Sequence, residues 1–497
     1  MRNTFKRQFE FGTTPIESIQ FDIHSRDDIP KILRGLQSIY VNDNIRDQVF
    51  SILETNIKKD VSFSKGRPGM DLWVLLVLGV LRLGMNCDYD RLNELANEHH
   101  SVRQMLGYGE WTNHHQYRLQ TIKDNVGLLT EDILQAINTV VVKHGHSLID
   151  SSQPDTLNAR CDSSVVETHV EYPTDTGMLF DAMRKTIRLT ARLCNEHGMK
   201  GLRQGEHNIS RIKTEWRKVQ YSNRCKKADA EQIKKAAHQC YLNTCTKYLN
   251  ASLLSIKALH RVADTLTDKN DCAAIGSEIA KTQGFQAHAS RLIDQIDRRV
   301  LQDKKIPSEE KIYSIFQEHT EWISKGKAGV PVELGIKVCI VEDQYQFILH
   351  HRVMKNEQDV DVAVKIVNDT KAKFSNLSSC SFDKGFYSKS NQMDLAKTIN
   401  TITLPKKGKL SAEDKAKEHT EGFKQARRQH SAVESAINAL EHHGFDRCPD
   451  HGVEGFKSYV GLSVLARNIQ QVGVIALGKQ KMSLKRKQKN HKEKITA

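Results

Sequence analysis

The 497-residue sequence has few of the residues that characterise several classes of protein. It contains only 9 Pro and 28 Gly, which excludes a collagenous chain and a chain of largely low complexity. Aromatic residues make up 6% of it, so binding of single-stranded nucleic acid by stacking bases on aromatic side chains is not favoured. The hydrophobic fraction is 38% and the mean hydropathy is −0.54, and these values exclude an integral membrane protein.

Long apolar runs and clustered cysteines are also missing. The most apolar stretch, Leu72–Leu81, is well short of the roughly twenty residues that cross a bilayer. The N-terminal residues MRNTFKRQFEFGTTP have no apolar segment after their early charges, unlike a secretory signal. The ten cysteines form no Cys-x-x-Cys pair, and Cys240 and Cys245 have no further Cys or His at zinc spacing. We expect reduced thiols in a soluble, cytoplasmic protein that binds no membrane.

Positive charge, in contrast, is abundant. The sequence has 74 Lys and Arg against 60 Asp and Glu, a formal net charge of +14. Residues 182–227 contain thirteen Lys and Arg against three Glu, and residues 479–497 contain eight against one Glu. A basic balance of this size indicates a polyanionic partner, with nucleic acid favoured over a membrane surface. We expect residues 479–497 to form a disordered basic tail.

The first 150 residues show helical periodicity. Apolar residues recur at helical spacing through much of this region. An apolar helix beginning at Leu72 is followed by a break and by Asp88, a residue suited to cap a second short helix. Two such helices form either a DNA-reading helix-turn-helix or a plain helical hairpin, and the apolar first helix favours the hairpin. We assign residues 1–150 to an N-terminal helical region that binds DNA.

A strand pattern begins after residue 150. Residues 157–166 are typical of a strand, and residues 334–350 predict a β-hairpin that turns at residues 342–344. Residues 360–404 alternate helix, strand, helix and strand, and residues 412–443 are helical. Without the residues between the first two strands, the order is strand, strand, strand, helix, strand, helix, strand, helix. This is the order of the RNase H-like fold.

We therefore expect an α/β RNase H-like catalytic core with a mixed five-stranded sheet, formed by residues 151–176 and 330–445. Residues 177–329 form a long, basic helical insertion into this core, and residues 446–478 form a C-terminal helical region. Such a core suits metal-assisted attack on a phosphodiester, in which two Mg²⁺ ions about 4 Å apart activate the nucleophile and stabilise the leaving oxygen. Because Mg²⁺ takes oxygen ligands, the core has to supply convergent carboxylates.

Three acidic residues fall where this fold needs them. Asp162 lies on the first strand among apolar residues, where an acid is costly unless it is paired or binds a metal. Asp383 ends the fourth strand, and Glu434 lies in the last helix beside an apolar face. Each has a structural alternative: a salt-bridged strand aspartate, a turn aspartate before Gly385, and a solvated helix glutamate.

Four segments resemble those of a known family. They are Asp162-Ser-Ser-Val-Val-Glu-Thr-His-Val-Glu-Tyr-Pro-Thr-Asp175, Lys327-Ala-Gly-Val-Pro-Val-Glu-Leu-Gly335, Ser381-Phe-Asp-Lys-Gly-Phe-Tyr387 and Gln429-His-Ser-Ala-Val-Glu-Ser-Ala-Ile-Asn438. Over about residues 60–470, the sequence resembles bacterial insertion-sequence transposases of the DDE type, most closely the group named "not classified yet" (ISNCY).

The resemblance implies roles for particular residues and partners. Asp162, Asp383 and Glu434 would be the catalytic triad and would hold two Mg²⁺ ions, with Mn²⁺ as a possible substitute. The N-terminal helical region would help to bind the terminal inverted repeats of double-stranded DNA. A homodimer is expected in the synaptic complex that holds the element ends.

One motif departs from that of a related clan of these transposases, which carries Tyr-x2-Arg-x3-Glu-x6-Lys on the last helix. Counted from Glu434, the Tyr, Arg and Lys positions hold Arg427, His430 and Glu441 in this sequence. The end-processing role of that Tyr and Lys therefore does not carry over. We interpret Arg427, Arg428 and His430 as candidate phosphate contacts, against the alternative of a solvated helix face.

The basic half of the insertion offers a second candidate DNA contact. Arg184, Lys185, Arg188 and Arg192 recur there at helical spacing. We interpret them as a face that lies along DNA phosphates, against the alternative of a solvated helical lid.

The function implied by the resemblance is cleavage of DNA at the ends of an insertion sequence, followed by transfer of the new 3′-OH to target DNA. One set of ions can serve both steps, since each is an in-line displacement at phosphorus. The sequence contains no Walker motif, so no ATP is implied. Two alternatives stay open: an RNase H-like nuclease that cuts without joining, and a DNA-binding relic of a transposase that has lost catalysis.

Overall fold

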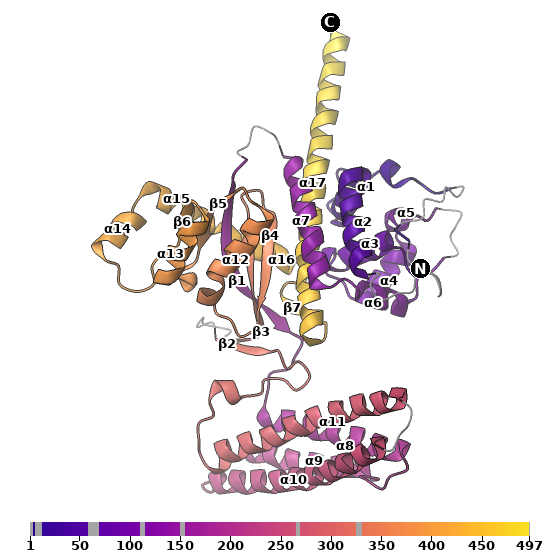
Figure 1. Ribbon diagram of the computed structural model, residues 1–497, viewed down its shortest axis with the longest axis vertical. Coiled ribbons are helices and arrows are strands. Elements are labelled where there is room, and N and C mark those ends of the chain that lie inside the picture. The colour runs from indigo at the N-terminus through magenta and orange to yellow at the C-terminus, as the bar shows by residue number, and fades with distance from the viewer. Residues whose placement is uncertain are drawn as a thin grey trace. The chain divides into compact units, whose positions relative to one another are not determined.

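The computed structural model describes residues 3–4, 12–57, 69–109, 115–149, 155–264, 269–324 and 331–496, with the backbone alone at 269 and 489–496. The chain divides into two compact units (Figure 1), the first made of residues 1–169 and 323–497 and the second of residues 170–322. The predicted boundaries at 150/151 and 329/330, and the start of the segment Lys327–Gly335, lie outside the described residues.

The strands of the described residues form one mixed, seven-stranded sheet. They are β1 (Leu157–Thr168), β2 (Glu321–Ser324), β3 (Val332–Glu342), β4 (Ile348–Met354), β5 (Leu377–Phe382), β6 (Thr401–Thr403) and β7 (Arg447–Cys448). The order is β2-β3-β1-β5-β6, with β4 also paired to β3 and β7 to β1. β3 is antiparallel to β1 and to β4, whereas β5 is parallel to β1 and to β6. Along the path β4-β3-β1-β5-β6, therefore, β3 alone runs against the others.

The sequence predicts five of these strands and misses two short ones. The predicted strands that begin at residues 157, 334, 377 and 400 correspond to β1, β3, β5 and β6, and the hairpin between β3 and β4 is present. β2 and β7 are not predicted, so the five-stranded expectation is wrong by two strands. Segments of four and two residues are too short to show an alternating pattern.

The first unit also contains most of the helices. They are α1 (Ile29–Val41), α2 (Asp43–Ile57), α3 (Leu72–Gly84), α4 (Tyr89–Glu98), α5 (His100–Met105), α6 (Leu119–Val126), α7 (Glu131–Ser147), α12 (Asp359–Lys373), α13 (Lys389–Thr398), α14 (Ala412–Glu418), α15 (Glu421–His430), α16 (Ala432–Glu441) and α17 (Gly452–Thr496). The predicted cap Asp88 accepts a backbone N–H at the start of α4, and Ser388 does the same at the start of α13. The helical stretch predicted at 412–443 is divided into α14, α15 and α16.

The N-terminal helices and the sheet share one hydrophobic core. Buried residues of α1–α7, β1, β3–β5, α12, α16 and α17 all belong to a single cluster. Every residue of α3 is buried, so this helix lies inside the core and the plain-hairpin interpretation is favoured over the helix-turn-helix. The described part of the predicted N-terminal helical region, residues 1–150, therefore belongs to the same compact unit as the sheet. The helix that joins them, α17, is the last in the chain, and local sequence patterns carry no information about that contact.

A buried amide network attaches α17 to α7 and to strand β4. The Asn468 side chain of α17 donates to Asn138 Oδ1 of α7 (2.7 Å) and to the backbone carbonyl of Ile348 (2.9 Å), and it accepts the Ile348 N–H (2.9 Å). Asn138 Nδ2 also donates to the Ile348 carbonyl (3.0 Å). Both amides are almost fully buried, so the network satisfies polar groups that would otherwise be costly in the core.

α17 also corrects one expectation about the C-terminal part of the chain. Its helix continues to Thr496, so the prediction of a disordered tail at 479–497 is wrong for the described part of that segment. By length and composition α17 is apolar enough to cross a membrane, but 72% of its most apolar window is buried inside the protein. This burial is consistent with a soluble protein.

The second unit is a helical bundle with its own core. Its main helices are α8 (Asp175–Glu196), α9 (Gly205–Ser222), α10 (Ala230–Ala263) and α11 (Lys269–Ile296), followed by the short turns η2 (Asp297–Leu301) and η3 (Ser308–Glu310). The sequence places the insertion at 177–329, and the compact unit spans 170–322. Its two apolar clusters draw on residues of this unit alone, among those that the structure describes.

The crossing of α1 and α17 generates a first prediction. A Cβ at Gly473 would lie 1.8 Å from the backbone oxygen of Lys31, and one at Gly35 would lie 2.0 Å from the oxygen of Ile469. The two helices are therefore in backbone contact, and Gly473→Ala has to push them apart. We expect this change to lower the free energy of unfolding by about 1–3 kcal/mol, measured by urea denaturation.

Gly478→Ala in the same helix is the matched control. A Cβ at Gly478 would meet nothing within 4 Å, so the change should be neutral or should raise stability by up to about 1 kcal/mol through helix propensity. Equal effects of the two substitutions would contradict the close crossing.

Candidate functional site

The pairing of β1 with β5 brings two of the predicted acids together. The strands are parallel, and their paired residues end with Cys161 opposite Phe382. The next residues along the two strands are Asp162 and Asp383, and the backbone of Asp383 is still extended (φ −77°, ψ 164°). Neighbouring strands lie about 4.8 Å apart. Asp162 and Asp383 are therefore side by side on adjacent strands, although 221 positions separate them in sequence (383 − 162).

The third acid, Glu434, approaches the same place from a helix. α16 buries Val433, Ala436 and Leu440, which leaves Glu434 exposed in its first turn. The helix packs on β1. The negative charge of Glu434 raises the pKa of the Asp162 carboxyl. Glu434 thus lies within electrostatic range of Asp162.

Asp162 carries a negative charge in unfavourable surroundings. The pKa of its carboxyl is raised from 3.8 to about 6, first by burial and then by the carboxylates of Asp383, Asp359 and Glu434, against a lowering by the N–H of Ser163. That N–H donates to Asp162 Oδ1 at 2.8 Å. Among the described residues no Lys or Arg forms an ion pair with Asp162. The salt-bridged alternative considered for this residue is therefore not observed.

A fourth carboxylate beside the site, Asp359, does have a cation partner. It begins α12 and accepts hydrogen bonds from Ser163 Oγ (2.7 Å) and Lys337 Nζ (3.1 Å). Its oxygen also lies 3.2 Å from where a Cβ of Gly385 would be, in the turn after Asp383. The sequence analysis missed Asp359, which on the sequence alone is an ordinary acid in the first turn of a helix.

His430, a predicted phosphate contact, lies close to the acids. Its Nδ1 is 3.0 Å from Ser381 Oγ, two residues before Asp383 on β5. Burial lowers the pKa of the imidazole and Arg160 lowers it further, while the charges of Asp383 and Glu434 raise it. His430 is therefore a partly buried group in the field of two of the three predicted catalytic acids.

The neighbouring predicted phosphate contacts, Arg427 and Arg428, are exposed on α15. Neither forms an ion pair with a described residue. On β1, Arg160 forms an ion pair with Glu342 of β3 (3.0 Å). This contact is not predicted from the sequence. Burial raises the pKa of Glu342 to about 7, and Arg160 opposes this.

A cleft of about 390 Å³ adjoins these residues. Its lining comes from β1, β5, β6 and the α15–α16 region and includes Arg160, Ser381 and Gln429. Arg160 and Ser381 each lie two residues before a predicted catalytic acid on the same strand, so alternation places them on the same face as Asp162 and Asp383. The cleft is thus an opening next to the acids, lined mainly by small polar side chains and one arginine.

The side chains of these acids are chemically suited to bind a metal ion, but their arrangement does not form a complete set of ligands. Among the described residues, no group of three His, Cys, Asp or Glu side chains is close enough to hold one ion. The structure therefore pairs Asp162 with Asp383 and leaves Glu434 near them without completing a three-carboxylate cage. Carboxylate oxygens are nevertheless the ligands that Mg²⁺ prefers, and the buried charge of Asp162 has no cation to offset it.

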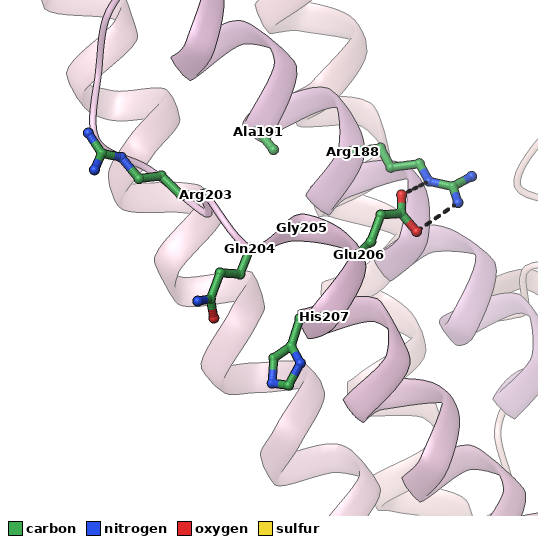
Figure 2. Close-up of a pocket in the computed structure, with 7 residues that line it drawn as sticks. All are labelled: Arg188, Ala191, Arg203, Gln204, Gly205, Glu206 and His207. Atoms are coloured by element: carbon green, nitrogen blue, oxygen red, sulfur yellow. Dashed lines mark hydrogen bonds and ion pairs between the residues drawn. The ribbon is translucent and has the colours of Figure 1, made fainter.

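The four candidate DNA contacts of the insertion are largely occupied within the second unit. Arg184 pairs with Asp181 (2.6 Å), and Arg188 pairs with Glu206 of α9 (2.8 Å), as Figure 2 shows. Arg192 pairs with Glu278 of α11, and Lys185 Nζ lies 5.7 Å from the centre of the Phe316 ring. α8 packs against α9, α10 and α11, so its charged residues lie along the seams and meet acids of the neighbouring helices. The predicted role of these four residues in binding DNA phosphates stays a prediction, and three of them are arginines that pair with acids of the same unit.

Comparison with family models finds no match to this chain, and comparison with curated proteins and with solved structures finds none either.

The surroundings of Asp162 generate a second prediction. A carboxyl whose pKa is raised on folding destabilises the folded state once it ionises, so stability falls as pH rises from about 4 to about 6. Asp162→Asn removes the charge and retains an oxygen for the Ser163 N–H. In the absence of divalent cations we expect the variant to be more stable than the original chain at pH 8, by at most about 3 kcal/mol, and equally stable at pH 4.

Denaturation with urea at both pH values measures this difference. Glu441→Gln, which neutralises an exposed carboxylate of α16, is the control and should show no such dependence on pH. The buried-charge interpretation would be contradicted if Asp162→Asn were no more stable than the original chain at pH 8. It would also be contradicted if the variant gained the same stability at pH 4 as at pH 8.

Proposed function

We propose that the chain is a transposase of the DDE type, an enzyme that cuts DNA at insertion-sequence ends and transfers the 3′-OH to target DNA. The observation that carries the proposal is the β1–β5 register, which makes Asp162 and Asp383 neighbours on parallel strands. The charge of Glu434, 51 residues further along (434 − 383), also reaches Asp162. A metal-dependent phosphodiester reaction needs such convergent carboxylates.

The strand arrangement supports the same proposal. The path β4-β3-β1-β5-β6, with β3 antiparallel to its neighbours, has the order and directions of an RNase H-like core. The chain enters the second unit after β1 and returns before β3, which agrees with an insertion between the first two strands of that core. The net charge of +14 suits a DNA substrate.

Each residue of the proposed site would have a separate role in the reaction. Asp162, Asp383 and Glu434 would hold Mg²⁺ or Mn²⁺, which when bound supplies Lewis-acid activation of the attacking oxygen and stabilises the leaving oxygen. Arg427 and Arg428, exposed and without an ion pair among the described residues, would bind phosphates beside the cut. His430 holds the end of α15 on β5 through Ser381, next to Asp383. We further propose a cytoplasmic location and a homodimer that brings two element ends together.

Loss of the carboxylates should abolish the reaction. In the presence of Mg²⁺ or Mn²⁺, Asp162→Asn, Asp383→Asn and Glu434→Gln should each reduce cleavage by at least about a thousandfold, because each removes a metal ligand. The substrate is a linear duplex that contains the DNA flanking the coding region, and cut and joined products are separated on a denaturing gel. Glu441→Gln, on the same helix as Glu434, should cut normally.

The same assay separates the alternatives. Cleavage without strand transfer from pre-cut ends would indicate a nuclease, and duplex binding without cleavage by the original chain would indicate a non-catalytic relic. Nicking of element ends that persists in Asp162→Asn would show that the assigned site is wrong.

Metal binding can be tested without DNA. Mg²⁺ at 10 mM should stabilise the original chain by about 1.4 kcal/mol if its dissociation constant is about 1 mM. Asp162→Asn should lose this stabilisation, since it removes the buried charge that the cation offsets. Thermal denaturation with and without Mg²⁺ measures the effect, and an equal Mg²⁺-dependent shift in both proteins would place the ion elsewhere.

A further inference from the structure

The outer face of α9 in the second unit is basic, and its arginines form no ion pair with a described residue. Its exposed residues include Arg203, His207, Arg211, Arg217, Tyr221 and Arg224. Those within the helix, His207, Arg211, Arg217 and Tyr221, fall on one side of the helix axis at 100° per residue, opposite the buried Ile209, Ile212 and Val219. Arg203 and Arg224 lie in the turns that flank the helix. We call this set the α9 outer face.

The side chains of the α9 outer face differ from the paired arginines of α8. No described residue forms an ion pair with Arg211, Arg217 or Arg224. Figure 2 shows the contrast at the start of α9, where Arg188 and Glu206 are joined and the Arg203 side chain points away from that pair. The two acids of the helix, Glu206 and Glu215, are already paired with Arg188 and Lys218. The positive charge of this face is therefore not neutralised within the unit.

The helix that carries this face is firmly held. The Trp216 ring stacks on Phe180 of α8, with centroids 4.9 Å apart and an interplanar angle of 4°. Ile209, Ile212 and Val219 are buried in the core of the unit. α9 can therefore present its arginines as a fixed array rather than as a flexible segment.

We infer that the α9 outer face binds the phosphate backbone of double-stranded DNA, and this inference rests on the proposed function for its choice of polyanion. Arginines, and the Tyr221 hydroxyl on a side chain that is 75% exposed, are phosphate-binding groups. From His207 to Tyr221, both within α9, the helix advances by about 21 Å at 1.5 Å per residue, which spans about six base pairs at 3.4 Å each. The contact carries no base readout, so it is independent of sequence.

The test compares two triple variants of the full chain. Arg211→Gln/Arg217→Gln/Arg224→Gln removes three charges from the α9 outer face. Arg184→Gln/Arg188→Gln/Arg192→Gln removes three paired charges from α8 in the same unit and is the matched control. Binding to a 30-base-pair duplex of arbitrary sequence is measured without divalent cations across a range of KCl concentrations, so that no cleavage intervenes. Circular dichroism and melting temperature verify that both variants are folded.

We expect the α9 variant to lose at least about tenfold in affinity at 100 mM KCl, and its slope of log K against log[KCl] to flatten by about 2–3, because three phosphate contacts are lost. The α8 variant should lose much less and should keep most of the slope. The inference is overturned if the α9 variant binds like the original chain, or if the α8 variant loses as much. It is also overturned if the α9 change weakens binding to vesicles with 30% phosphatidylserine and leaves duplex binding intact.

The outcome is separable from that of the proposed function. An original chain that binds duplex through the α9 outer face and cuts nothing with Mg²⁺ would contradict the transposase proposal and leave this inference standing. An α9 variant with unchanged duplex binding, in a chain that cuts element ends, would contradict the inference alone.

Discussion

The parallel pairing of β1 with β5 is the constraint on which the rest of the site depends. Parallel strands cannot be joined by a short turn, so the two segments that carry Asp162 and Asp383 have to be far apart in the chain. The register of the pair then decides which residues meet, and one residue of slippage would turn Asp162 to the opposite face of the sheet. The buried Cys161 and Phe382, aligned immediately before the acids, hold that register by burying apolar side chains.

The same pairing places the buried Asp162 near other carboxylates, and a bound cation would offset their negative charge. Burial and three neighbouring carboxylates oppose ionisation of Asp162 and raise its pKa to about 6. Asp359, its neighbour, is offset by Lys337, while Asp162 accepts the backbone N–H of Ser163 and forms no ion pair with a residue that the structure describes. A fold that retains an uncompensated acid in the middle of a central strand is less stable than one with an amide there, a pattern expected where stability is given up for binding or chemistry.

In the second unit, the packing of the helices decides which basic side chains pair with acids and which stay exposed. Arg188 and Arg192 of α8 belong to the most basic stretch of the sequence, but α8 is packed against three helices and its arginines meet Glu206 and Glu278. α9 lies at the edge of the bundle and keeps Arg211 and Arg217 in solvent. Helical spacing identifies which residues share a face, and the packing of the bundle decides whether that face is open.

Local pattern alone determined the longer strands, the capped helices and the acidic residues worth considering, because alternation, capping and apolar spacing are properties of neighbouring residues. It did not determine β2 and β7, the continuation of α17 past residue 479, or the union of residues 1–150 with the sheet. Those depend on contacts such as Asn468 with Ile348, 120 positions apart, and on backbone contact at Gly473. The tertiary structure likewise decided that Asp162 and Asp383 are neighbours, that Glu434 stays exposed beside them, and that Asp359 joins them, since side chains distant in sequence interact only when strand register and helix packing bring them together.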